Sequence, residues 1–130
     1  YPQKIGDLIE EYRFKEAQFE LMNVARLGNK YLADTAPWHL IKSDQEQVQT
    51  VLNIALQLTA NIAILGAPFL PFTSQQLSTM LGIAPSVWRM AANIDLLKPG
   101  QAVQQPTLLF ERIEDHTIQQ QLACYKTTQL

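Results

Sequence analysis

Residues 43–66 constrain the fold most strongly, because they hold no proline and carry apolar side chains at helical spacing along their whole length. Ser43 and Glu46 fit the Ser-x-x-Glu capping box, which predicts that a helix begins at this point. The apolar positions cover much of the helix circumference, which is typical of the central helix of a bundle. They are Val48, Val51, Leu52, Ala55, Leu56, Leu58, Ile62, Ala63 and Leu65. We therefore expect this helix to lie in the core of the fold.

Two helices are predicted before this central one. An apolar stripe at i, i+3, i+4 and i+7 indicates the first, and a pattern from Phe14 keeps one face of the second apolar for about five turns. The stripes consist of Ile5, Leu8, Ile9 and Tyr12, and of Ala17, Leu21, Val24, Ala25, Gly28 and Leu32. Gly28 is expected to permit close helix packing. Pro37 disfavours helical geometry at the residue before it, so the second helix ends there and a short helix carrying Trp38 runs to Lys42.

Prolines punctuate the next part of the chain. Pro68 and Pro71 predict a rigid elbow, Thr73 with Gln76 forms a second capping box, and Gly82 suits a helix C-cap. A short helical piece is expected over residues 85–92. Its tryptophan, Trp88, is expected in the core or at a junction.

The C-terminal part differs in composition from the rest. Residues 98–107 are rich in proline, glutamine and glycine and indicate a linker, and residues 107–110 are expected to be extended. Asp115 is a candidate N-cap for a last helix. One face of this helix carries Ile118, Leu122 and Tyr125. We expect it to pack back on the domain.

The fold class follows from these patterns and from the composition. Only 5 glycines occur among 130 residues, and long stretches lack turn signals, which favours helices over regularly punctuated strands. A chain of this length with 47% hydrophobic residues suffices for one domain with a single core. The prediction is an all-α antiparallel helical bundle over 1–97, with a linker and C-terminal extension over 98–130.

The sequence also predicts the cellular compartment and whether the chain is part of a longer protein. The single cysteine, Cys124, excludes an internal disulfide and is expected to be a half-buried thiol in a reducing compartment, which indicates the cytoplasm. No uninterrupted apolar run reaches the roughly 20 residues of a membrane span, because Asn53, Gln57, Thr59 and Asn61 interrupt the most hydrophobic stretch. The chain starts at Tyr1 and enters helical periodicity at once, so we expect it to be part of a longer protein.

Catalysis and metal binding have little support in the sequence. His39 and His116 lie far apart, and neither shares a helical face with a carboxylate or thiol at metal-ligand spacing, so each is expected to be ordinary surface or core. Asp115 is better explained as a cap than as one of an acid/base pair with Glu111 or Glu114. The glycines are scattered singly, so no phosphate-cradling loop is present.

Overall charge gives no sign of a nucleic-acid partner, since the net charge is -2 and phosphate contacts usually require a basic surface. Recognition of unstacked loop bases depends on stacking and base-edge hydrogen bonds as well, so the test is local. One face of the second helix is the candidate, because it joins amide and basic side chains to a nearby aromatic ring. Its residues, RNA-facing or supporting, are Asn23, Arg26, Asn29, Lys30, Tyr31 and Lys42 beside Trp38. The alternative is that Trp38 packs between helices and the polar residues are solvated surface.

A family resemblance can now be stated. Asn29-Lys30-Tyr31, followed by Pro37-Trp38, is similar to the segment of bacterial-type methionyl-tRNA synthetases in which an Asn-Lys-Tyr helix end leads to a Pro-Trp turn. Further landmarks follow in the same order: Leu52-Asn53-Ile54, Pro68-Phe69-Leu70-Pro71-Phe72-Thr73, Trp88, and Leu109-Phe110-Glu111-Arg112-Ile113-Glu114-Asp115. The resemblance covers nearly the whole chain and implies a helical anticodon-binding domain.

The resemblance implies that Trp38 packs against the cytosine at the first anticodon position, with Asn29 and Tyr31 supporting the bend beneath the indole. The family's other anticodon readers, an asparagine and an arginine one helical turn apart, belong to an upstream helix that this chain does not contain. Their roles therefore do not transfer to Asn23 and Arg26.

The resemblance also implies which functions lie elsewhere. The family's His/Gly and Lys/Ser motifs for nucleotide and methionine do not occur here, so the chain alone is expected to catalyse nothing and to bind no cofactor. ATP, and zinc where the parent enzyme uses it, belong to a catalytic domain of the same parent chain. The implied partners are that domain and the anticodon loop of tRNA(Met), with no membrane. A parent homodimer would form through a module outside this chain.

Two other functions compete with this prediction. The chain could be a helical protein-interaction domain without RNA binding, or the corresponding domain of a related synthetase for cysteine, valine or isoleucine. The Pro37-Trp38 turn after Asn29-Lys30-Tyr31 favours methionine. Few cations lie on the candidate face, so weak RNA binding by the isolated chain is expected.

Overall fold

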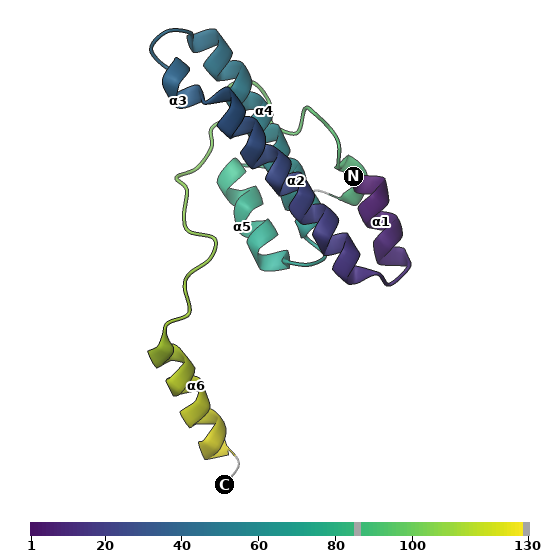
Figure 1. Cartoon of the computed structure of the whole chain (residues 1–130), viewed down its shortest axis with the longest axis vertical. Helices are drawn as coiled ribbons and strands as arrows, with labels where there is room; N and C mark the ends of the chain where they lie inside the picture. Colours follow the sequence, from purple (N-terminus) through teal and green to yellow (C-terminus); the bar gives the residue numbers. More distant parts are fainter. Residues whose placement is uncertain (85–86, 129–130) are drawn as a thin grey trace.

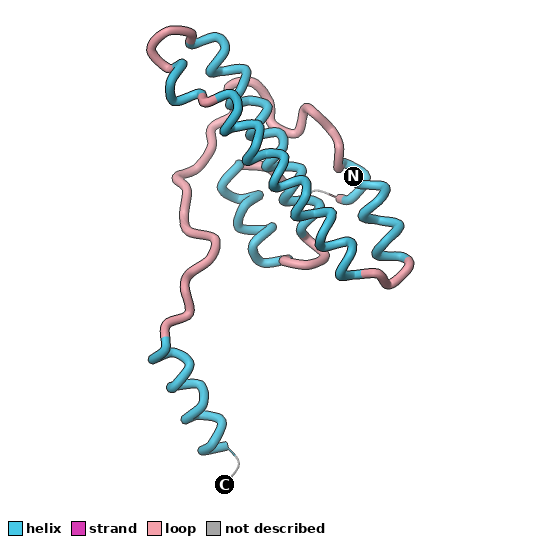
Figure 2. Tube along the Cα trace, in the orientation of Figure 1, coloured by secondary structure: helices cyan, strands magenta, loops and turns pink. Residues whose placement is uncertain are grey.

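The computed structural model describes residues 1–84 and 87–128, with side chains up to residue 125, and these residues form helices and connecting loops without a strand (Figures 1 and 2). The helices are α1 (Pro2–Glu10), α2 (Phe14–Thr35), α3 (Pro37–Leu40), α4 (Gln45–Gly66), α5 (Pro71–Leu81), the 3-10 helix η1 (Trp88–Met90) and α6 (Asp115–Thr128). This confirms the all-α prediction. The expected helical piece at 85–92 is shorter than predicted, and Pro85 lies outside the described residues.

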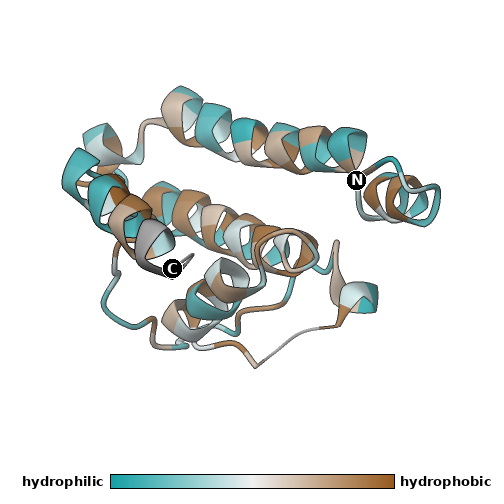
Figure 3. Cartoon of the chain, turned by 90° about the horizontal axis from the view of Figure 1, so that it is seen from below, coloured by the Kyte–Doolittle hydropathy of each residue, from teal (hydrophilic) through white to brown (hydrophobic). Residues whose placement is uncertain are grey.

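Helix α4 is the centre of the bundle, as its apolar circumference predicts. Helices α2, α3, α5 and η1 all pack against it, and α1 packs on α2. One group of buried residues joins α1, α2 and α4, and a second joins α4 and α5 to the loop at Leu97. The first contains Ile5, Leu8, Ala17, Leu21, Val24 and Leu65, and the second contains Ala60, Leu81 and Leu97. Figure 3 shows hydrophobic and hydrophilic residues alternating around the helices, as amphipathic helices require.

Helix α4 is long and apolar enough to cross a membrane by length and composition alone, although Asn53, Gln57, Thr59 and Asn61 interrupt its apolar run. Its packing identifies it instead as the core helix of a bundle. The Gln57 side chain of α4 is buried and forms hydrogen bonds with the backbone of Leu96 and Leu97, which lie in the loop packed against this helix.

Gly28 lies where α2 and α4 approach closely, as predicted. A Cβ added there would sit 2.8 Å from Cδ2 of Leu58, closer than two carbon atoms normally come. Trp88 is half-buried and packs against α1 at Gly6, which confirms its expected place at a junction.

The predicted capping boxes are wrong in detail. The cap of α4 is Asp44, whose carboxylate accepts a hydrogen bond of 2.9 Å from the Gln47 amide, while the Ser43 hydroxyl donates to the carbonyl of Leu40. Helix α5 starts at Pro71, two residues before Thr73, and has no side-chain cap.

Two further predictions at helix ends can be compared with the structure. The expected C-cap at Gly82 is confirmed by its left-handed backbone, with φ of 66°. Tyr12 lies beyond the end of α1 with φ of 60° and its side chain 82% exposed, so it does not extend the apolar stripe.

Residues 92–101 are attached to the bundle by side-chain amides rather than forming a loose linker. Asn61 binds the backbone of Ala92 and Asn93, and Gln57 binds the backbone of residues 96–97. Farther along, the Gln101 amide donates to the carbonyls of Leu81 and Gly82 at the end of α5. The segment just after residue 97 therefore stays in contact with the bundle.

The last helix does not meet its expected packing in this arrangement. Figure 1 shows α6 at the end of the segment that follows the bundle and clear of the other helices. Its apolar face is exposed at Ile118, Leu122 and Tyr125, and Cys124 is exposed rather than half-buried. The carbonyl of Glu114 accepts from the Thr117 amide, so Asp115 lies in the first turn of α6 rather than before it.

Candidate nucleic-acid interface

The junction between α2 and α3 is fixed by one residue in an unusual conformation. Ala36 has φ of 40° and ψ of 57°, the left-handed region, and ends one helix while it precedes the next. Its amide donates to the carbonyl of Leu32, and its carbonyl accepts a 2.9 Å bond from the His39 amide. Pro37 is buried, and α3 packs on α4. These contacts hold the short helix at a defined angle to α2.

Trp38 projects from this fixed support into solvent. Its side chain is 58% exposed, so it does not pack between helices as the alternative interpretation required. Its ring centroid lies 6.1 Å from that of His39, with 60° between the ring planes. An exposed indole on an anchored helix can present an aromatic face to an unstacked base at low cost in conformational entropy.

The polar outer face of α2 is engaged in contacts within the domain. The guanidinium of Arg26 donates to Asn23 Oδ1 at 2.9 Å and lies 5.6 Å from the ring centroid of Phe19. The Asn23 amide in turn reaches Glu20, which pairs with Lys4 at 2.7 Å. The hydrogen bond from Lys4 lowers the pKa of the Glu20 carboxyl. Asn23 and Arg26 thus belong to a chain of contacts between α2 and α1.

The remaining candidates lie nearer the junction. Lys30 forms an ion pair of 2.9 Å with Asp34 one turn later, whereas Asn29 and Lys42 are exposed. Tyr31 is half-buried, and its carbonyl accepts a bond from the Thr35 hydroxyl at 2.7 Å. This bond closes the last turn of α2 just before Ala36.

The structure therefore divides the predicted site residues into two groups. Tyr31 has contacts that suit its expected supporting role at the bend. Asn23 and Arg26 lie about two turns and one turn before Lys30 on α2, and their contacts run toward α1 rather than toward Trp38.

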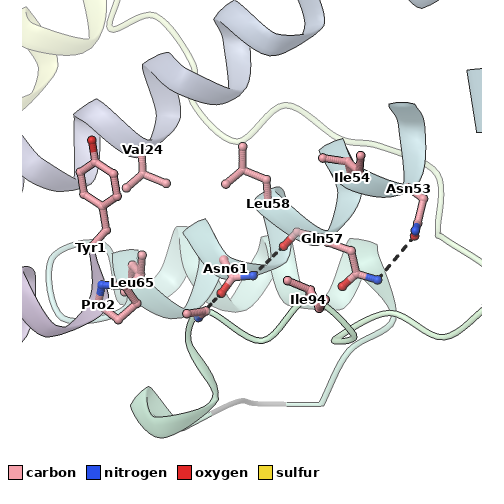
Figure 4. Close-up of a pocket in the computed structure, with 11 residues that line it drawn as sticks. Tyr1, Pro2, Val24, Asn53, Ile54, Gln57, Leu58, Asn61, Leu65 and Ile94 are labelled. Carbon is pink, nitrogen blue, oxygen red and sulfur yellow. Dashed lines mark hydrogen bonds between the residues drawn. The ribbon is translucent and has the colours of Figure 1, made fainter. Parts of the chain in front are cut away.

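A separate apolar groove does not resemble a catalytic site. It has a volume of about 570 Å³ and lies between α2, α4 and the loop at 92–94 (Figure 4). Two of its polar side chains, Gln57 and Asn61, already bind loop and helix backbone. The described residues that line it include no carboxylate, imidazole or thiol side chain to act as acid, base or nucleophile.

Comparison with known proteins decides the family. Residues 3–129 match the family described as the anticodon binding domain of methionyl tRNA ligase. The chain belongs to this family. Relatives named methionine–tRNA ligase include proteins of Cytophaga hutchinsonii, 52% identical over 94% of this chain, and Phocaeicola vulgatus, 50% identical over 92%. A third, from Porphyromonas gingivalis, is 46% identical over 98%.

This anticodon-binding domain corresponds to a small part of each relative. The matched region is 18% of the length of the Cytophaga and Phocaeicola ligases and 19% of the Porphyromonas ligase. The family match supports the resemblance found in the sequence and favours methionine over the cysteine, valine and isoleucine alternatives.

Sequence reasoning missed one neighbour in the anticodon-binding domain. His39 was expected to be ordinary surface or core; it is on the surface, and the structure places its ring beside that of Trp38. Its position next to the tryptophan was visible in the sequence. Only the bend at Ala36 and the packing of α3 show that both rings remain uncovered.

Proposed function

We propose that the domain recognises the anticodon loop of the methionine tRNA, with the indole of Trp38 stacking on the cytosine at the first anticodon position. The exposed position of Trp38 on a helix anchored by Pro37 carries this proposal. Loop bases that are not stacked on one another are commonly bound by aromatic side chains. Membership of the anticodon-binding family supports the assignment of the partner.

The proposal extends to the whole protein. The full-length protein would be a methionine–tRNA ligase of the cytoplasm that attaches methionine to tRNA(Met) with ATP. The catalytic domain of the same polypeptide would bind ATP, and zinc where the enzyme uses it. The domain described here would select the tRNA, because a wrong base leaves hydrogen-bonding groups unpaired and loses stacking.

Charge indicates weak binding by the isolated domain. The chain has a net charge of -2, and Lys30 is already paired with Asp34. The electrostatic contribution to RNA binding is therefore small. Nanomolar affinity of the isolated domain for an anticodon stem-loop would contradict this expectation.

Replacing Trp38 with alanine in the full-length ligase tests the proposal. Loss of one base–aromatic stack costs about 1–3 kcal/mol, so kcat/KM for tRNA charging should fall about five- to 150-fold. Methionine activation by ATP without tRNA should be unchanged, since it does not involve the anticodon. Trp38→Phe should retain part of the charging activity because it keeps an aromatic face.

Phe72 provides a matched control. It is an aromatic residue on α5 with 85% exposure, so Phe72→Ala removes a ring that is even more exposed than Trp38 from another surface. Charging by this variant should be normal. If Trp38→Ala charges tRNA as well as the unchanged enzyme does, Trp38 is not an anticodon contact.

A further inference from the structure

Two exposed aromatic rings lie side by side on α3, and the proposed function uses one of them. The ring centroids of Trp38 and His39 are 6.1 Å apart. Both residues belong to the same short helix, whose first residue Pro37 is buried and which packs on α4. A partner bound on Trp38 would therefore have the imidazole of His39 at its edge.

The contacts of His39 leave its ring available. Its backbone amide donates a hydrogen bond to the carbonyl of Ala36, and this bond fixes the backbone from which the side chain projects. Within the described part of the chain, the ring nitrogens accept and donate no hydrogen bond, and the nearest aromatic contact is with Trp38. The imidazole is therefore exposed, and among the described residues its aromatic contact is with Trp38.

The angle between the rings indicates what kind of ligand could use both. The planes are inclined by 60°, so two bases stacked on one another could not lie flat on both rings. Bases splayed apart in a single-stranded loop could do so. Histidine is among the side chains on which such bases stack.

We propose that the imidazole of His39 is a second stacking surface, which binds the nucleotide adjoining the base on Trp38. This inference rests on the proposed function, because it requires an RNA loop at α3. It assigns a distinct residue and a distinct nucleotide. The two rings together would hold two neighbouring bases at an angle, which only an unpaired loop permits.

Substitutions in the full-length ligase separate stacking from hydrogen bonding. His39→Ala and His39→Gln should each raise KM for tRNA about fivefold, the lower end of the effect of one stacked base. His39→Phe should keep KM near its original value, because it retains a flat ring without the nitrogens. Methionine activation without tRNA should be unchanged in all three variants. His116→Ala, at an exposed histidine on α6, should have no effect and serves as the control.

Fluorescence locates the nucleotide directly. A tRNA with 2-aminopurine on one or the other side of the first anticodon base should be quenched on binding at the adjoining position, and His39→Ala should remove that quenching. Normal KM and quenching in His39→Ala, together with a charging defect in Trp38→Ala, would overturn this proposal alone. Normal charging by Trp38→Ala would overturn the proposed function as well. If His39→Gln behaves like the unchanged enzyme, the contact is a hydrogen bond and the stacking proposal is wrong.

Discussion

Replacing Gly28 with alanine tests the close approach of α2 and α4. An added Cβ would lie 2.8 Å from Cδ2 of Leu58 and 3.7 Å from its Cγ. Leu58 is half-buried against the first group of core residues, so its side chain has limited room to move. The clash involves the end of a side chain rather than the backbone, so we expect a measurable loss of stability without loss of the fold.

The magnitude comes from two opposing effects. Alanine in place of glycine inside a helix contributes about 1 kcal/mol of stability through helix propensity. Overpacking a core contact costs about 1–3 kcal/mol. The net loss in the free energy of unfolding should be about 1 kcal/mol, which for a domain of this size lowers Tm by about 4 °C.

Thermal and urea unfolding, followed by circular dichroism, measure this loss. Gly6 on α1 is the control, since its added Cβ would meet Trp88 Nε1 at 3.4 Å, an ordinary contact. Gly6→Ala should therefore raise stability by about 0.5–1 kcal/mol. The same substitution at two helical glycines should thus have opposite signs.

A double-mutant cycle with Leu58→Ala isolates the clash. Removing the Leu58 side chain makes room for the new methyl group, so Gly28→Ala should become stabilising in that background. The coupling between the two substitutions should be about 2 kcal/mol, within the range for residues in contact. Additive effects, or equal gains at Gly6 and Gly28, would refute the argument from close packing.

The remaining predictions concern one buried amide and one ion pair. Gln57→Ala leaves the Leu96 and Leu97 amides and the Leu97 carbonyl without their partner. At about 1–3 kcal/mol for each buried group, the free energy of unfolding should fall by about 3 kcal/mol. Replacing the exposed Gln49 on the same helix with alanine should change the free energy of unfolding by less than about 0.5 kcal/mol, and equal effects of the two substitutions in urea unfolding would contradict this. Because its hydrogen bond with Lys4 lowers the pKa of Glu20 in the folded domain, the stability from this pair is present above the unfolded pKa of about 4.3 and is lost as the pH falls through the lower folded pKa. Glu20→Gln should therefore show a smaller loss of Tm between neutral and acidic pH than the unchanged domain, and identical Tm curves would show that the pair contributes nothing.

The sequence predicted the presence of the helices better than it predicted the residues at which they begin. Both Ser43 with Glu46 and Asp44 with Gln47 have the spacing of a capping pair, and the pattern cannot choose between them. The choice depends on which residue leaves helical geometry, and Asp44 does so with φ of -148°. Thr73 failed as a cap for a related reason, because Pro71 is suited to the first turn and the helix starts there.

The candidate site was predicted in part. Trp38 could be singled out because a proline before it fixes a bend and the family resemblance gives it a role. Its exposure could not be predicted, since a tryptophan after a bend can equally pack between helices. The contacts of Arg26 with Asn23 and Phe19 were also not predictable, because side chains on one face of a helix can bind one another or remain in solvent.

The sequence by itself determined the helical class, the central place of α4 and the family, because apolar periodicity and short motifs are local properties that survive any arrangement of the helices. Tertiary structure alone decided that residues 92–101 are held by Gln57, Asn61 and Gln101, since those hydrogen bonds join positions about 20 to 40 residues apart. It also decided that α6 lies clear of the bundle and that Trp38 and His39 face solvent together. Exposure depends on which distant surfaces meet, and a local pattern does not contain that information.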